Sequence, residues 1–451
     1  MQMKTLKWLA MPLLALSLTG LTTACSDKND DEEEQGGGTP AGTLTPEENK
    51  ERLSQIGKNF MNAIPASDFN ELDQLANYIK TTYCDDNQTE AVETWANNCF
   101  KALTKTVLPD KIETYATYEY TRRIYELSKF RAHLSYNETT QRWDVLESPN
   151  YLQATCKDQN GQLVVAKLTT SGNTKRVYIG EIEMDKEYGY NQTTYEMDQA
   201  YAEIPENINI TLTRGNQALV NVTVTTDLSS MTSENFDLSK DAASVTVRAQ
   251  LAGYDIQCNR ITAQANRENG AVVNLLINKN GQKLLSAEVT GTAGLPSGLV
   301  WSEYTDMDAF EDKLENFTGK VTVCKADIMG QLQVTAVCND AHKIYELFER
   351  AEDNKHDASI VQSCAQEINS YFTAQFFYDG GSIAQGHMEI EAAPNSKGNK
   401  YYLEPAIVFP DGSRYNMTNN SYFNEDNFKS FIDLFDTLSD NYERMIEKYD
   451  D

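Results

Sequence analysis

Short turns of the Asn-Gly type recur along the middle of the chain, and they constrain its fold more than any other feature. They occur at Asn160-Gly161, Asn269-Gly270 and Asn280-Gly281, with a related Gly-Asn pair at Gly215-Asn216. Asn and Gly adopt the positive φ angles that two-residue hairpin turns require. The segments between the turns are rich in Val, Ile, Leu and Thr, so the pattern predicts a large antiparallel β-meander over residues 111–300. The expected strands include 208–213, 218–225, 261–266, 271–277 and 284–289.

Three amphipathic helices are predicted ahead of the meander, within residues 45–110. The stretch that begins at Thr45 has a hydroxyl cap, a proline at the first helical position and a glutamate that completes a capping box. Apolar residues then recur at helical spacing until Pro65. The same spacing predicts a second helix over 67–83 and a third over 89–107.

An α+β section is predicted for residues 301–451. It contains a hairpin over 321–337, helices over 340–353 and 357–371, several strands, and a closing helix from Asn424. The closing helix has a broad apolar stripe, which predicts that it docks on the sheet. The fold class expected is therefore α+β: an N-terminal three-helix segment, a large antiparallel β-meander, and a C-terminal α+β section with a closing helix. The stripe consists of Phe428, Phe431, Ile432, Phe435, Leu438, Tyr442 and Met445.

Residues 1–24 have the pattern of a bacterial export signal. Lys4 and Lys7 precede an apolar run over 8–21, which is too short to cross a bilayer as a folded helix. Small residues then lead into Cys25. This arrangement resembles a lipobox, in which the cysteine thiol is acylated and becomes the first residue of the mature protein. The resemblance implies a lipid anchor at Cys25, and the alternative is an ordinary secretory signal in which Cys25 is incidental.

An acidic run and a glycine-rich tether follow over residues 25–44. Such sequence cannot bury apolar surface, so we expect a solvated linker. An acidic run directly after the lipid cysteine resembles the surface-export signal of Bacteroidetes lipoproteins, and the alternative is a generic spacer. The resemblance implies a protein that is anchored to the outer membrane through its acyl chains and faces the cell exterior. The residues of the export signal would be Asp30, Asp31, Glu32, Glu33 and Glu34.

The charge of the chain excludes nucleic acid as a partner. It has 39 basic and 67 acidic side chains, a formal net charge of −28, whereas phosphate contacts require a basic surface. The sequence contains 4 histidines, and none stands in the arrangement of a zinc protease. We therefore expect no catalytic residue, no metal site and no cofactor. Abundant carboxylates leave one alternative open, a hydrolase of extracellular polymer that uses a pair of them.

Cysteine spacing suggests two disulfides. Seven cysteines follow Cys25, an odd number, so at least one thiol stays free, and no Cys-x-x-Cys motif is present. Cys84 and Cys99 flank a predicted helix link, and Cys324 and Cys338 lie near opposite ends of one predicted hairpin. These are the two pairs that we expect, with the other cysteines acting as small buried hydrophobes.

Tyrosines in polar company give the one indication of a binding surface. Two predicted strand connections combine tyrosine with Asn, Gln and Thr, a composition that suits stacking on sugars and hydrogen bonding to hydroxyls. The alternative is that tyrosine is simply a good strand residue. The candidate ligand-binding residues are Tyr188, Tyr190, Tyr195, Tyr415 and Tyr422.

These features together suggest a surface-exposed, non-enzymatic lipoprotein. Its ligand would be a glycan, a lipid-like molecule or another envelope protein, and its remaining partner the bilayer that holds the acyl chains. A polymer hydrolase and a structural or adhesive subunit are the alternatives. A deep pocket with two facing carboxylates would favour the hydrolase, and a long apolar groove would favour a lipid-like ligand. A flat face of tyrosine and asparagine would favour a glycan or adhesion.

Overall fold

The computed structural model has a mixed α+β fold. N-terminal helices are followed by 17 strands in a largely antiparallel meander, with two further helices between the later strands. This confirms the fold class expected from the sequence. The predicted closing helix lies outside the described residues, as do Cys25 and the acidic segment after it. The structure describes residues 42–103, 119–148, 150–184, 196–237, 239–263, 267–294, 318–395 and 397–416.

The chain divides into two compact units. Of the described residues, those within 42–68, 267–294 and 318–416 belong to unit 1, and those within 69–263 belong to unit 2. The elements of unit 2 are α3 (Asn70–Tyr83), α4 (Asp86–Leu103), β1 (Glu119–Glu126), β2 (Ala132–Asn137), β3 (Arg142–Leu146), β4 (Tyr151–Lys157), β5 (Leu163–Met184), β6 (Glu196–Arg214), β7 (Gln217–Asp227), β8 (Ala243–Leu251) and β9 (Tyr254–Ala263). Those of unit 1 are α2 (Pro46–Ala63), β10 (Ala271–Lys279), β11 (Gln282–Thr292), β12 (Lys320–Ile328), β13 (Leu332–Cys338), α6 (Ala341–Asp353), α7 (Ala358–Tyr371), β14 (Phe372–Tyr378), β15 (Gly386–Pro394), β16 (Tyr401–Val408) and β17 (Arg414–Asn416).

Hairpin turns fall where the Asn-Gly pairs predicted them. Between β10 and β11, Asn280 has φ 49° and Gly281 has φ 81°, values that a two-residue turn of this kind needs at both positions. The turn between β8 and β9 is Ala252-Gly253, with φ angles of 50° and 81°. Alanine gives no turn signal of its own, which is why the sequence did not indicate this hairpin.

Two strand pairs in unit 2 are parallel, unlike a pure meander. β1 pairs in parallel with the first part of β6, over Glu196–Glu203, and β2 pairs in parallel with β4. The length of β6 explains the first case, because β7 pairs only with the second part of β6, over Asn207–Arg214. The edge that β7 leaves unpaired is the one that β1 occupies.

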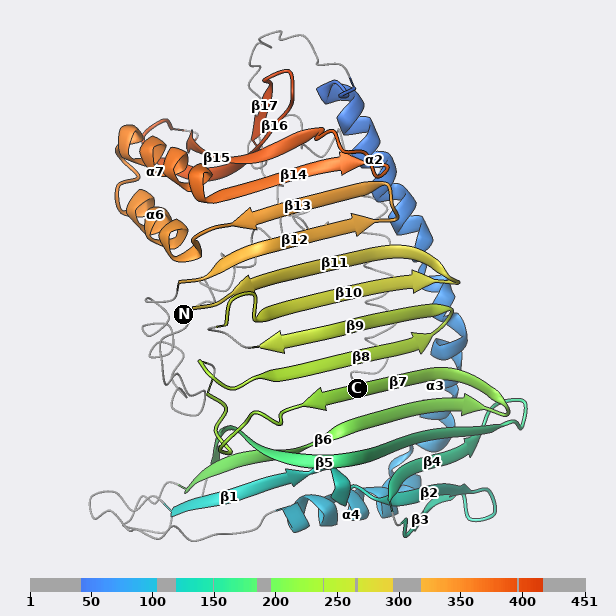
Figure 1. The fold of residues 1–451 in the computed structure, drawn as a ribbon. Coiled ribbons are helices and arrows are strands. Elements are labelled where there is room, and N and C mark those ends of the chain that lie inside the picture. Colours follow the sequence, from blue (N-terminus) through green and yellow to red (C-terminus); the bar gives the residue numbers. More distant parts are fainter. Residues whose placement is uncertain are drawn as a thin grey trace. The chain divides into compact units, whose positions relative to one another are not determined.

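In unit 1, α2 begins with the capping box that the sequence predicts. The Glu48 amide donates to Thr45 Oγ1 at 3.3 Å, and the Thr45 amide donates to Glu48 Oε2 at 2.8 Å. Ile56 on this helix packs against Ile328 and Phe376 in a buried cluster. Figure 1 shows α2 at one end of β14 and the pair α6 and α7 at the other, where α7 packs on β15 and β16.

In unit 2, α3 packs against the strands through Leu75 and Tyr83. These side chains share a buried cluster with Trp143, Cys156 and Val164. The Tyr83 hydroxyl donates to the backbone oxygen of Lys157 at 2.9 Å, so the last residue of α3 is fastened to the end of β4.

Candidate ligand-binding surfaces

A row of apolar side chains crosses six consecutive strands of unit 2, from β4 to β9. Residues that are paired in register lie side by side on one face of a sheet. Five of the six are half-buried, and Ile210 at the middle of the row is 41% exposed. We call this row the apolar ladder; its members are Leu152, Leu168, Ile210, Val222, Ala249 and Ile256.

The neighbouring row, one residue along each strand, lies on the opposite face and is polar throughout. Successive side chains of a strand alternate between faces, so the two rows share a backbone but not a surface. On the polar face Arg248 forms a two-point ion pair with Asp255, at 3.1 and 3.0 Å, and this pair holds the pKa of Asp255 below its usual range. We call this row the polar ladder; its members are Gln153, Lys167, Thr211, Asn221, Gln250 and Asp255.

Helix α3 covers the apolar face beside the apolar ladder, not over it. The buried cluster around Leu75 and Tyr83 takes in Ala154, Leu212 and Val220, which lie two residues along from ladder positions. None of the six members of the apolar ladder belongs to this cluster as the structure describes it. A strip of apolar side chains therefore continues past the helix.

The strand sequences contain the signal for this two-faced sheet. In the second part of β6, Ile208, Ile210 and Leu212 alternate with Asn or Thr, and in β7 the residues Val220, Val222 and Val224 do the same. Strict alternation of this kind predicts one apolar and one polar face. The strands themselves were expected from the sequence, but only the register shows that their apolar residues join into one row.

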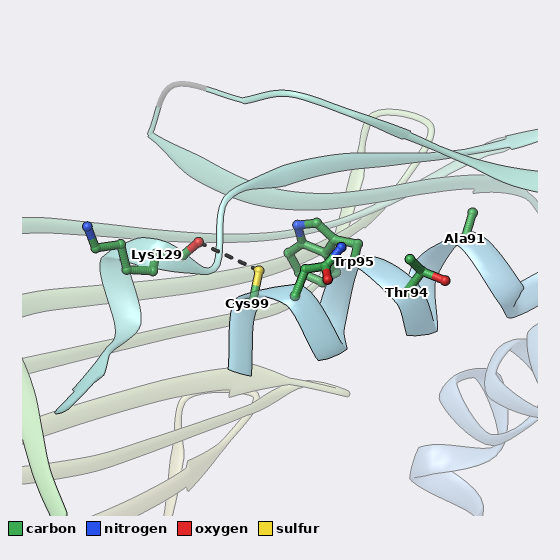
Figure 2. A pocket seen from close by; sticks show the side chains of 6 residues that line it. Ala91, Thr94, Trp95, Cys99 and Lys129 are labelled. Atoms are coloured by element: carbon green, nitrogen blue, oxygen red, sulfur yellow. Dashed lines mark hydrogen bonds between the residues drawn. The ribbon is translucent and has the colours of Figure 1, made fainter. Parts of the chain in front are cut away.

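A shallow hollow of about 410 Å³ lies on α4, where the helix approaches η3 (Leu127–Lys129) (Figure 2). The Trp95 and Phe130 rings meet edge-on, with their centroids 6.4 Å apart. The Cys99 thiol donates a hydrogen bond to the backbone oxygen of Lys129, with sulfur and oxygen 4.0 Å apart. Burial raises the pKa of the Cys99 thiol, so this sulfur is a poor nucleophile at neutral pH. No carboxylate or imidazole is among the lining residues, which are Ala91, Thr94, Trp95, Asn98, Cys99 and Lys129.

In unit 1, three charged groups of β15 and β17 pair with one another. His387 Nε2 lies 2.9 Å from Glu389 Oε1, and Arg414 forms an ion pair with the same carboxylate. Burial opposes ionisation of Glu389, but these two neighbours hold its pKa below its usual range. Within the described ranges no three side chains of the metal-binding types come together as a cluster.

Two carboxylates, Asp237 and Asp241, are buried in the turn between β7 and β8. Asp241 Oδ2 accepts the Asp237 amide at 2.9 Å, and Asp237 Oδ1 accepts the Ser239 amide at 2.9 Å and its hydroxyl at 2.6 Å. Lys240 Nζ lies 3.0 Å from Asp237 Oδ2. The turn itself therefore uses these oxygens, which act as local hydrogen-bond acceptors.

The structure holds the seven described cysteines as free thiols, so neither expected disulfide is present in it. Cys84 precedes α4 and Cys99 lies thirteen residues into that helix, which places them about 20 Å apart along the helix axis. A disulfide requires Cα atoms within about 7 Å. Cys324 pairs in register with Ala336, and Cys338 with Val321, so these two cysteines are diagonal neighbours at a separation that a disulfide does not span.

Tyr415 is the single candidate tyrosine among the described residues. It lies in β17 and pairs in register with Ile407. Its ring packs against the buried cluster around Ile56 and meets the Phe409 ring edge-on, with ring centroids 5.7 Å apart. Its ring thus contributes to packing in unit 1. The other four candidates, Tyr188, Tyr190, Tyr195 and Tyr422, lie outside the described residues, as do Asp30, Asp31, Glu32, Glu33 and Glu34.

Comparisons with protein-family models, with curated proteins and with solved structures found no match to this chain. Of the helices that the structure describes, none combines the length and the apolar character needed to cross a membrane.

Proposed function

We propose that this chain is a non-enzymatic, lipid-anchored outer-membrane protein that faces the cell exterior and binds a lipid-like ligand. The observation that carries the proposal is the apolar ladder, with Ile210 41% exposed at its middle. Burying apolar surface is worth about 25 cal/mol per Å², so a row of exposed or half-buried aliphatic side chains favours an apolar occupant. The polar ladder gives the opposite face no such preference.

The dimensions of the apolar ladder suit an acyl chain. Six strands at a spacing of about 4.8 Å span about 24 Å from the first side chain to the last. The hydrocarbon core of a bilayer is about 30 Å thick, so the chains of one leaflet reach about 15 Å. One extended chain thus fits within the length of the row.

The N-terminal sequence supports a location where such a ligand is available. Acylation of Cys25 would hold the protein at a membrane, and the acidic tether over 26–34 would keep the folded units away from anionic headgroups. The hollow on α4 is lined by neither carboxylate nor imidazole, so it gives the polymer-hydrolase alternative no support.

Binding of a fluorescent long-chain fatty acid tests the proposal. The full chain with Cys25→Ser would be used, because the anchored form needs detergent, which would itself occupy an apolar face. We expect saturable binding that an unlabelled fatty acid displaces and that a soluble oligosaccharide does not. Absence of saturable binding to folded protein, or displacement by the oligosaccharide instead, would exclude a lipid-like ligand.

A further inference from the structure

Cys84 and Cys156 lie next to two hydrogen bonds that fasten the end of α3 in unit 2. Tyr83 directly precedes Cys84, and its hydroxyl donates at 2.9 Å to the backbone oxygen of Lys157, which directly follows Cys156. The backbone oxygen of Tyr83 accepts the indole N–H of Trp143 at 2.8 Å. Tyr83 and Cys156 also belong to one buried cluster. The residues on either side of the attachment point are thus two cysteines that are far apart in sequence.

The two thiols differ in exposure. Cys156 is buried, and burial raises its pKa to about 11, with a further contribution from negative charge on Cys84. Cys84 is exposed at the end of α3, and desolvation raises the pKa of its thiol as well. Cys84 is the thiol that a soluble reagent can reach first.

We propose that Cys84 and Cys156 form a disulfide when the chain meets a small disulfide oxidant such as oxidised glutathione. The Cys84 thiolate attacks one sulfur of the oxidant, forms a mixed disulfide and releases one glutathione thiolate. The Cys156 thiolate then attacks the Cys84 sulfur and releases the second glutathione. The protein loses two protons and two electrons, and the oxidant is reduced to two glutathione thiols.

This pair replaces the Cys84–Cys99 pair that the sequence suggested. α4 carries Cys99 about 20 Å away from its own start, whereas the fold returns β4 to the end of α3. The new bond would close a loop of about 70 residues and join α3 covalently to the sheet beside the apolar ladder. Its occurrence in cells rests on the proposed export to an oxidising compartment, but the reaction in solution does not.

Peptide mapping of the oxidised full chain tests the proposal. The reduced protein is incubated with oxidised glutathione, free thiols are alkylated, and the chain is cut with trypsin and with a protease that cleaves after glutamate. The second protease is needed because no Lys or Arg lies between Cys84 and Cys99, whereas Glu90 and Glu93 do. We expect one cross-linked product that joins the Cys84 peptide to the Cys156 peptide, and a rise of about 10 °C in the unfolding temperature.

Variants in which one cysteine is replaced by serine give the control. Cys99→Ser should leave both the cross-link and the rise in unfolding temperature unchanged, whereas Cys84→Ser should abolish both. Because formation requires thiolates of raised pKa, the oxidation rate should increase with pH through the alkaline range. A cross-link between Cys84 and Cys99, or full alkylation of Cys84 and Cys156 after oxidation of wild-type protein that remains folded, would overturn the proposal.

Discussion

The indole nitrogen of Trp143 donates a hydrogen bond to the backbone oxygen of Tyr83 at 2.8 Å. The bond is buried, and the Tyr83 ring lies edge-on to the indole with ring centroids 6.4 Å apart. It joins the last turn of α3 to β3, while the Tyr83 hydroxyl joins the same turn to β4. One residue at a helix end thus receives its position from two separate strands.

Trp143→Phe should destabilise unit 2 because it removes the donor and leaves the Tyr83 carbonyl buried without its partner. The expected loss is about 1–3 kcal/mol in the free energy of unfolding. Urea unfolding followed by circular dichroism measures it. Trp95→Phe is the matched control, since the Trp95 ring lies at the open hollow on α4, and its loss should be smaller. Equal losses in the two variants would contradict the role assigned to the Trp143 bond.

The capping box of α2 gives a second prediction. Thr45→Ala removes the hydroxyl that accepts the Glu48 amide and should cost about 1 kcal/mol in the free energy of unfolding. Thr45→Ser keeps the hydroxyl and should cost only a small part of that. Chemical unfolding of the three proteins makes the comparison. A loss for serine as large as that for alanine would show that the methyl group, not the cap, carries the effect.

Acid should weaken the turn that contains Asp237. Burial opposes ionisation of this carboxyl, but hydrogen bonds from Ser239 and Lys240 hold its pKa below its usual range. A folded-state pKa below the unfolded value, about 3.9, stabilises the fold above that pH, and the contribution is lost as pH falls through the folded pKa. Unfolding free energy measured from pH 6 downward should fall less steeply in Asp237→Asn than in wild type. Identical acid limbs would contradict the prediction.

Removal of the expected anchor should change where the protein is found. Cys25→Ala cannot be acylated at that position and should move the protein from the membrane pellet to the supernatant after cell lysis. Changing Asp30, Asp31, Glu32, Glu33 and Glu34 to Ala should leave it in the pellet but protect it from protease added to intact cells. Digestion of that variant as fast as wild type would contradict the export role of the acidic run.

Local sequence signals accounted for the elements but not for their assembly. Thr45 and Pro46 fixed the start of α2 because a cap acts on its own helix within one turn. The Asn280-Gly281 turn was likewise predictable, since its φ angles are a property of two residues. The parallel pairing of β1 with β6 was not, because it joins segments that no turn connects.

For the candidate surfaces too, the sequence predicts local features but not how distant residues come together. Alternation in β6 and β7 was visible in the sequence, but whether Ile210 lies beside Val222 depends on register across the hairpin. The polar neighbours of Tyr415 in the sequence predict a binding residue, yet its ring packs on Phe409, because tertiary contacts decide which tyrosines stay exposed. The structure does not bring Cys84 and Cys99 together for a related reason, since their closeness in sequence hides the length of the helix between them.

One matched pair of variants shows whether a lipid-like ligand binds along the apolar ladder. Ile210 and Thr211 are adjacent in β6 and lie on opposite faces of the sheet. In the chain with Cys25→Ser, Ile210→Gln should weaken binding of the fluorescent fatty acid at least tenfold, which is about 1.4 kcal/mol. Thr211→Gln should leave the affinity unchanged, with both variants folded by circular dichroism. Equal affinities for the two variants and the parent chain would contradict the claim.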